Sequence, residues 1–232
     1  MSANAASPST LIALDLDGTL EDSRDDMVAA VVRVRAAFEL PARPGGDFVE
    51  HVNRGMPHLY RVCFEELLGD PPAHARAQQA YVADYSAHIA DSTRLYPGIA
   101  DALAELSELG SLAIVTNKPE GLSDRLLRAL EVRERFAVVI GGDSCAEPKP
   151  SAVPLRTAAA RLGIAPPVEG ERPPRVFMIG DSAGDVRCGR AAGARVIWCA
   201  WGYKDDPGEL SPDAIARTPD ALPGLVRAAL AG

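Results

Sequence analysis

The sequence predicts an α/β protein: a Rossmann-like, doubly wound parallel sheet with an inserted α-helical cap domain. Short apolar runs alternate with helical patterns after residue 95, another apolar run spans residues 11–15, and the block between them has helical spacing only. Repeated strand–helix units favour a parallel sheet with helices on both faces. We therefore expect an α/β core domain at residues 11–22 and 95–232, a helical cap domain at residues 23–94, and a disordered tail at residues 1–10.

Length and charge narrow the classes of function. The chain has 232 residues, which suffices for one α/β domain with a smaller insert. Its formal net charge is -8 and it has no basic block, which argues against a nucleic acid or an anionic membrane surface as partner. A small anionic substrate is still allowed, because a bound divalent cation can reverse the local field.

The sequence also bears on where the protein works. No segment is long and apolar enough to span a bilayer, and the first ten residues lack the basic start and apolar run of a signal peptide. The four cysteines show no CxxC pair and no histidine at zinc-finger spacing, so we expect small buried side chains in a reducing compartment. We therefore expect a cytoplasmic protein without a membrane partner, as a monomer or a homodimer.

The elements follow in order along the chain. Residues 11–15 form an apolar run that ends in a carboxylate and is followed by Gly18, which is typical of a buried strand meeting a tight loop. The cap block has helical spacing at residues 28–38, 59–68 and 73–89. Ser151 is placed to cap a helix of the core domain. A Pro-rich linker is expected at residues 165–174, and the other core elements are helices at 99–110, 119–130, 151–163 and 183–192 and strands at 112–115, 137–140, 175–179 and 195–199.

Two carboxylates stand at the end of the first predicted strand, in Asp15-Leu16-Asp17-Gly18-Thr19. Carboxylates packed together repel, so such a pair normally needs a cation or a shared proton, and oxygen ligands suit Mg²⁺. A carboxylate beside a neutralised phosphate is a competent nucleophile, and a second one can protonate the leaving oxygen and later deprotonate water. We therefore expect Asp15 as nucleophile, Asp17 as acid and base, and Mg²⁺ as cofactor.

Further polar residues follow other predicted strands, and ligands of parallel sheets bind beyond the carboxyl ends of the strands. Thr116 and Asn117 offer a hydroxyl, an amide and the N–H groups of a helix start to a phosphate. Lys149, between two prolines, can neutralise both a phosphate and nearby carboxylates. Asp181 is placed to complete the metal site. Asp185, one helical turn later, is expected to orient the metal ligands without binding the metal itself.

These four segments resemble, in order and approximate spacing, the motifs of the haloacid dehalogenase superfamily. The resemblance covers the chain from about residue 11. It implies that Asp15 is nucleophile and metal ligand, that the backbone carbonyl of Asp17 binds the metal, and that Asp181 is a metal ligand. Thr116 and Lys149 are implied as phosphate ligands, and the helical block as a cap that closes over the substrate and excludes water.

The chain is most similar to the phosphoglycolate phosphatases of this superfamily. Four stretches carry this similarity: Thr116-Asn117-Lys118-Pro119, residues 138–144, Pro154-Leu155 and Trp201-Gly202-Tyr203. Two segments depart from it: Ser151-Ala152 stands where that branch usually has His-Pro, and Asn53-Arg54-Gly55 where paired glycines are common. A small phosphorylated acid needs a second cation, so we expect Arg54 to contact the substrate carboxylate.

Other functions stay open on the same scaffold. The substrate can be another small phosphate (a sugar phosphate, a nucleotide or pyrophosphate), or the protein can be a phosphosugar mutase, which returns the phosphate to the sugar. A non-catalytic binding protein is a further alternative. Haloacid dehalogenation is disfavoured because those relatives lack the second aspartate, and phosphonate hydrolysis because its cap lysine is missing: no lysine precedes Lys118.

Overall fold

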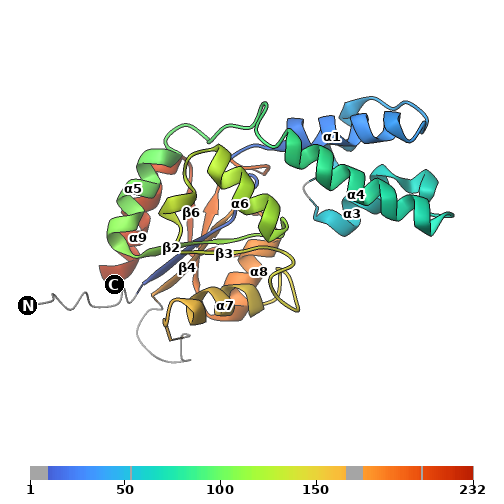
Figure 1. Ribbon diagram of the computed structural model, residues 1–232. Helices are drawn as coiled ribbons and strands as arrows, with labels where there is room; N and C mark the ends of the chain where they lie inside the picture. The colour runs from blue at the N-terminus through green and yellow to red at the C-terminus, as the bar shows by residue number, and fades with distance from the viewer. Residues whose placement is uncertain (1–9, 53, 166–174, 205, 232) are drawn as a thin grey trace, which may run out of the picture. The chain divides into compact units, whose positions relative to one another are not determined.

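The computed structural model describes residues 10–52, 54–165, 175–204 and 206–231 (Figure 1). The chain divides into two compact units: the described residues up to Glu21 together with those from Leu95 onward, and Asp22–Arg94. Two predicted segments lie almost entirely outside the described residues: the tail at residues 1–10, of which only Thr10 is described, and the linker at 165–174, of which only Ala165 is described. Asn53 also lies outside them.

The first unit is built on one parallel sheet of six strands in the order β3-β2-β1-β4-β5-β6. This order is that of a Rossmann-type sheet, which confirms the predicted fold class. The strands are β1 (Leu11–Leu14), β2 (Ser111–Val115), β3 (Val138–Ile140), β4 (Val176–Gly180), β5 (Arg195–Cys199) and β6 (Ala214–Ala216).

The register of the three central strands aligns their carboxyl ends. Leu14 pairs with Ile114 of β2 on one side and with Ile179 of β4 on the other. The chain order reverses between β1 and β4, and a sheet of this type binds its ligand in the crevice beside such a switch point. Residues that directly follow β1, β2 and β4 therefore meet at one edge of the sheet.

Helices cover both faces of the sheet. On the first face, α7 (Val153–Arg161) and α8 (Ala183–Ala192) pack on the strands and on each other. On the other, α5 (Ile99–Leu109) packs on α9 (Leu222–Ala231), and these two helices contact β2 and β6 respectively. The first face buries alternate strand residues, as the pleat requires. Its buried strand side chains are Leu11, Ala13, Ala113, Val115, Val138, Ile140, Val176 and Met178. The remaining helical segments of this unit are α6 (Glu120–Ala129), η3 (Arg133–Arg135) and η4 (Pro219–Ala221).

The second unit consists of helices in its described residues and contains no strand there. Its main contact is between α1 (Arg24–Ala37) and α4 (Pro71–Ala87). Within α4 the rings of Tyr81 and Tyr85 stack, with their centroids 5.9 Å apart. Buried Asp26 accepts hydrogen bonds from the backbone N–H groups of Ser92 and Thr93, which ties the start of α1 to the end of the unit. The elements are α1 (Arg24–Ala37), η1 (Gly45–Phe48), α2 (Val49–Val52), α3 (Met56–Cys63), η2 (Glu65–Leu67) and α4 (Pro71–Ala87).

Three details of the predicted elements differ from the structure. The helix expected over residues 59–68 ends at Cys63 and is followed by the separate turn η2. Ser151 is not the N-cap of α7: Ala152 occupies that position, and the Ser151 hydroxyl accepts a hydrogen bond from Val153 N–H at 3.2 Å. The last strand, β6, and the last helix, α9, were not predicted. Three residues, Ala-Ile-Ala, are too short a run to indicate a strand.

Candidate active site

Asp15 stands where β1 ends, at the edge of the sheet described above. Its backbone N–H continues the strand ladder by donating to the Ile179 carbonyl at 2.9 Å, so its position is set by the sheet. The side chain is nearly buried, and its Oδ1 accepts a hydrogen bond from Leu16 N–H at 2.8 Å. A carboxylate with so little water around it needs charged partners to stay ionised.

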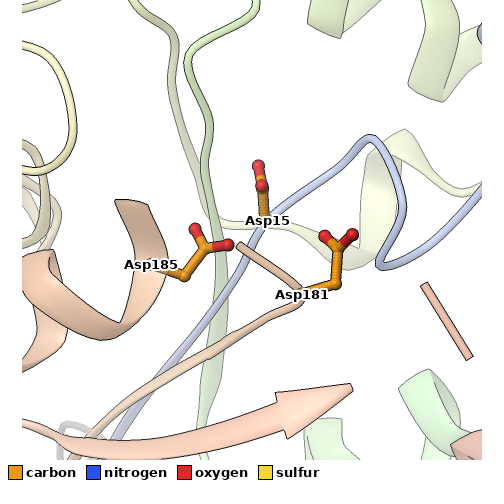
Figure 2. Close-up of side chains that lie close together, drawn as sticks. All are labelled: Asp15, Asp181 and Asp185. Carbon is orange, nitrogen blue, oxygen red and sulfur yellow. The ribbon is translucent and has the colours of Figure 1, made fainter. Parts of the chain in front are cut away.

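Three carboxylates converge here from separate segments. Figure 2 shows Asp15 after β1, Asp181 after β4 and Asp185 in the first turn of α8, with their side chains approaching one another. One oxygen of each lies within 4.8 Å of one oxygen of the others, and all three residues are buried. Because like charges at this distance repel, the cluster favours either protons or a cation.

The pKa values of the cluster reflect this repulsion. Burial raises the pKa of Asp15 to about 6; Asp185 adds to the rise and Lys149 opposes it. Burial likewise raises the pKa of Asp181 to about 7, with Asp185 and Asp15 adding to the rise. Both carboxyls therefore bind a proton more tightly than a free aspartate, and a cation that displaced these protons would relieve the same repulsion.

Lys149 is the cation that pairs with this cluster within the described part of the chain. Its Nζ lies 2.8 Å from Oδ1 of Asp15 and 2.6 Å from Oδ1 of Asp185, and its side chain is 2% exposed. Burial alone would lower the pKa of Lys149, but the two carboxylates outweigh burial and raise it above its ordinary value. Lys149 is therefore an ammonium fixed between two aspartates.

The loop that carries Lys149 is held by Asn117. The Asn117 side-chain amide donates to the Lys149 carbonyl at 3.1 Å, and its Oδ1 accepts from Lys149 N–H at 3.0 Å. Asn117 thus lies at the predicted strand end, but both polar atoms of its side chain contact the Lys149 backbone. Thr116 precedes it, is buried, and accepts a hydrogen bond from Lys118 N–H at 3.2 Å.

Asp181 is fixed by donors that carry no charge. Its Oδ2 accepts from Tyr203 N–H at 2.8 Å and its Oδ1 from the Thr19 hydroxyl at 3.2 Å. Two glycines make room for it: a Cβ added at Gly18 or at Gly202 would lie 2.7 Å from Asp181 Cγ, inside van der Waals contact. The Asp181 carboxylate therefore lies in a closely fitted cradle, and no cationic side chain of the described residues forms an ion pair with it.

Asp185 has both oxygens engaged. Oδ1 accepts from Lys149, and Oδ2 accepts from the backbone N–H and the hydroxyl of Ser182, at 2.9 Å and 2.6 Å. Ser182 in turn caps α8, so the two residues form a reciprocal capping box. Asp185 thus belongs to the carboxylate cluster by distance, while its hydrogen bonds orient Lys149 and the start of α8.

Asp17 is not one of the three clustered carboxylates, but its charge adds to the rise in the pKa of Asp15. Its side chain forms an ion pair with the ammonium of Lys118, which follows the end of β2. The Lys118 side chain is 3% exposed and that of Asp17 17% exposed. Lys118 stands in the Thr-Asn-Lys-Pro segment of the sequence, but no pattern there indicated that its charge meets Asp17.

The donor set fits a hard divalent cation. Three buried carboxylates face one ammonium, which leaves an excess of negative charge, and the available ligand atoms are oxygens, the type that Mg²⁺ prefers. Asp185 accepts from the Lys149 ammonium and from Ser182, whereas Asp181 accepts from the uncharged Tyr203 N–H and Thr19 hydroxyl, so the charge of Asp181 is less compensated. Of the three, Asp15 and Asp181 are the better candidates for direct metal ligands.

The remaining residue singled out in the sequence, Arg54, belongs to the other unit. Its side chain is 57% exposed, and its NH2 group lies 4.0 Å from a Glu50 carboxylate oxygen. An exposed pair at that distance contributes little to stability.

Across the described part of the chain, each helix is too short or too polar to cross a membrane.

The fold and the site together define a class: a Rossmann-type α/β enzyme with a carboxylate-rich centre at the switch point of its sheet. The sequence matches the model of the haloacid dehalogenase-like hydrolase family over residues 12–199. The chain belongs to this family.

Relatives and solved structures agree with this assignment. The chain is 38% identical to a phosphoglycolate phosphatase of Chromobacterium violaceum, over 84% of this chain and 86% of that protein. It is 36% identical to a plasmid-encoded phosphoglycolate phosphatase of Cupriavidus necator, over 97% and 96%. A crystal structure of a predicted phosphoglycolate phosphatase from Haemophilus somnus has the same fold, with a TM-score of 0.81 at 22% identity, covering 96% of this chain and 99% of that one.

Proposed function

We propose that this protein is a magnesium-dependent phosphatase that hydrolyses 2-phosphoglycolate to glycolate and phosphate. Family membership supports the class of reaction, since the family consists of hydrolases. Curated relatives at 32–38% identity that carry the name phosphoglycolate phosphatase support the substrate. One observation supports this chemistry most directly: Asp15 lies in a buried cluster of carboxylates, with its Oδ1 2.8 Å from Nζ of Lys149.

In the proposed reaction Asp15 is the nucleophile. One of its carboxylate oxygens forms a bond to phosphorus while the bond from phosphorus to the ester oxygen breaks, and the electron pair of that bond stays on the ester oxygen. Lys149, together with the hydroxyl of Thr116, is proposed to bind the phosphate oxygens and to hold the group in line. Asn117 is proposed to keep Lys149 in place through its two hydrogen bonds to the Lys149 backbone, rather than to bind phosphate with its side-chain amide.

Asp17 is proposed to move the protons. Its carboxyl group donates a proton to the departing ester oxygen, which gives glycolate, and the resulting carboxylate then takes a proton from water. The water oxygen forms a bond to phosphorus while the bond from phosphorus to Asp15 breaks. Phosphate is released, and the carboxylate of Asp15 is restored. Each proton lost by Asp17 in the first half is regained in the second.

The metal would be held by Asp15 and Asp181, with the backbone carbonyl of Asp17 as the third protein ligand. Bound there, Mg²⁺ supplies positive charge to the phosphate oxygens and neutralises the carboxylates. Asp185 is proposed to act through Lys149, which it contacts at 2.6 Å. Thr19 and Tyr203 keep the Asp181 carboxylate oriented by their hydrogen bonds to it.

The test is phosphate release from 2-phosphoglycolate with and without Mg²⁺, for the wild type, Asp15→Asn and the exposed control Asp220→Asn. We expect magnesium-dependent release that Asp15→Asn lowers by at least about a thousandfold and that Asp220→Asn leaves unchanged. Full activity in Asp15→Asn would refute the covalent mechanism. In the same assay with a sugar phosphate as substrate, transfer of the phosphate to another position of the sugar, without release, would identify a mutase instead.

A further inference from the structure

Lys118 has a charge whose purpose the proposed reaction does not explain. The chain has three lysines: Lys149 lies in the carboxylate cluster, Lys204 is exposed, and Lys118 is buried at the end of β2. The Lys118 ammonium contacts the carboxylate of Asp17, the residue proposed to donate the proton. Burying an ammonium is costly, so its presence beside Asp17 calls for a function.

The backbone of Lys118 is fixed on both sides, so only its side chain is free to change partner. Its N–H donates to the Thr116 hydroxyl at 3.2 Å, and its carbonyl accepts from Gly142 N–H at 2.9 Å. A Cβ at Gly141 would lie 2.8 Å from the same carbonyl oxygen, so the glycine pair allows a close backbone approach. The ammonium is therefore presented from a rigid base.

Asp17 has a different partner in the structure from the one that the proposed reaction requires. Here its Oδ1 contacts the Lys118 ammonium, whereas in the first step its carboxyl group contacts the ester oxygen. In 2-phosphoglycolate a single CH2 group separates the ester oxygen from a carboxylate. A cation within contact of Asp17 is thus within reach of the substrate carboxylate when Asp17 contacts the ester oxygen.

We propose that Lys118 exchanges partners on substrate binding: it leaves Asp17 and pairs with a carboxylate of the substrate, which frees Asp17 to turn to the ester oxygen. The inference rests on the proposed phosphatase function and names what that site selects, a small phosphomonoester with a carboxylate beside the ester carbon. A substrate without this carboxylate offers Lys118 no replacement anion, so Asp17 must break its ion pair with Lys118 without compensation. Losing a buried ion pair in this way slows the reaction and discriminates against such a substrate.

The experiment compares two substrates that differ in one group: 2-phosphoglycolate and 2-hydroxyethyl phosphate, which has a CH2OH group in place of the carboxylate. The kcat/KM ratio of the two is measured for the wild type, Lys118→Met, Lys118→Gln and Lys204→Met. Arg54→Met is included because the sequence favoured Arg54 for the same carboxylate. Lys118→Gln keeps a side chain that can hydrogen-bond Asp17, so it serves if Lys118→Met does not fold.

We expect the wild type to prefer 2-phosphoglycolate by at least about a hundredfold. Either Lys118 variant should lower that ratio to within about tenfold of unity, with the loss for 2-phosphoglycolate appearing in kcat as well as KM, because Asp17 is no longer released by the substrate. Lys204→Met and Arg54→Met should keep the wild-type ratio.

Three results would overturn the inference, and a fourth would overturn the proposed function on which it rests. Equal losses on both substrates in the Lys118 variants would make Lys118 a structural residue. Loss of the preference in Arg54→Met alone would assign the carboxylate to Arg54. A wild type that hydrolyses both substrates equally well, with Mg²⁺, would refute carboxylate selection while leaving phosphatase chemistry intact; release of phosphate from neither substrate would refute the proposed function itself.

Discussion

Replacing Lys149 with methionine removes the cation that two buried aspartates share. In the folded protein its ammonium lies 2.8 Å from Asp15 and 2.6 Å from Asp185, and the three side chains are 2%, 11% and 0% exposed. Removing one partner of such a buried pair typically costs about 3–5 kcal/mol, because the other charge is left without compensation. For a chain of this size about 1 kcal/mol lowers Tm by about 2–4 °C, so we expect a loss of about 6–20 °C.

The assay is thermal denaturation at pH 7.5 in the presence of a chelator, with Lys204→Met as the matched control. Lys204 is exposed, and its replacement should change the free energy of unfolding by less than about 0.5 kcal/mol. The double variant Lys149→Met with Asp185→Asn should regain about 1–3 kcal/mol, because one of the two repelling charges is gone. A Tm for Lys149→Met that equals the Tm of Lys204→Met would refute the assignment of Lys149 as the counter-charge of the cluster.

Two further predictions concern the metal site and its packing. The pKa values of Asp15 and Asp181 are raised from 3.8 to about 6 and about 7 in the folded protein. Between about pH 4 and 7 the folded metal-free protein therefore binds more protons than the unfolded chain. Its stability decreases as the pH rises through this window. Mg²⁺ must displace these protons; the increase in Tm on adding Mg²⁺ should therefore be larger at pH 8 than at pH 5.5, and an increase that is the same at both values would contradict the assignment. A Cβ at Gly202 would lie 2.7 Å from Asp181 Cγ, so Gly202→Ala should lower the free energy of unfolding by about 1–3 kcal/mol and weaken Mg²⁺ binding in a titration. Gly224→Ala, where a Cβ meets nothing within 4 Å inside helix α9, should be neutral or stabilising, and equal effects of the two substitutions would remove the role given to Gly202.

The sequence sufficed for the sheet and for the position of the key carboxylates. Buried parallel strands appear in a sequence as continuous apolar runs. The strands β1, β4 and β5 are such runs, and helical patterns separate them along the chain. Parallel topology then brings the residues after β1 and β4 to one edge, which is why Asp15 and Asp181 could be expected together although 166 positions separate them. The same argument could not detect β6, whose three residues form too short a pattern.

The partners of these carboxylates were harder to predict because they depend on side-chain directions and on backbone groups. Asp17 and Lys118 are 101 positions apart, and nothing in their local patterns indicates that they pair. Asp181 is held partly by Tyr203 N–H, and a backbone donor leaves no signature in a sequence. Asn117 has a residue type suited to phosphate, yet its amide is directed at the Lys149 backbone; only the path of the loop decides between the two.

The central claim is that the carboxylates of Asp15 and Asp181 share one divalent cation. The most direct measurement is anomalous diffraction from crystals grown with Mn²⁺ in place of Mg²⁺. We predict one strong peak at bonding distance from an oxygen of each of these two residues, absent in crystals of Asp181→Asn. A peak elsewhere on the molecule, with none between Asp15 and Asp181, would contradict the account.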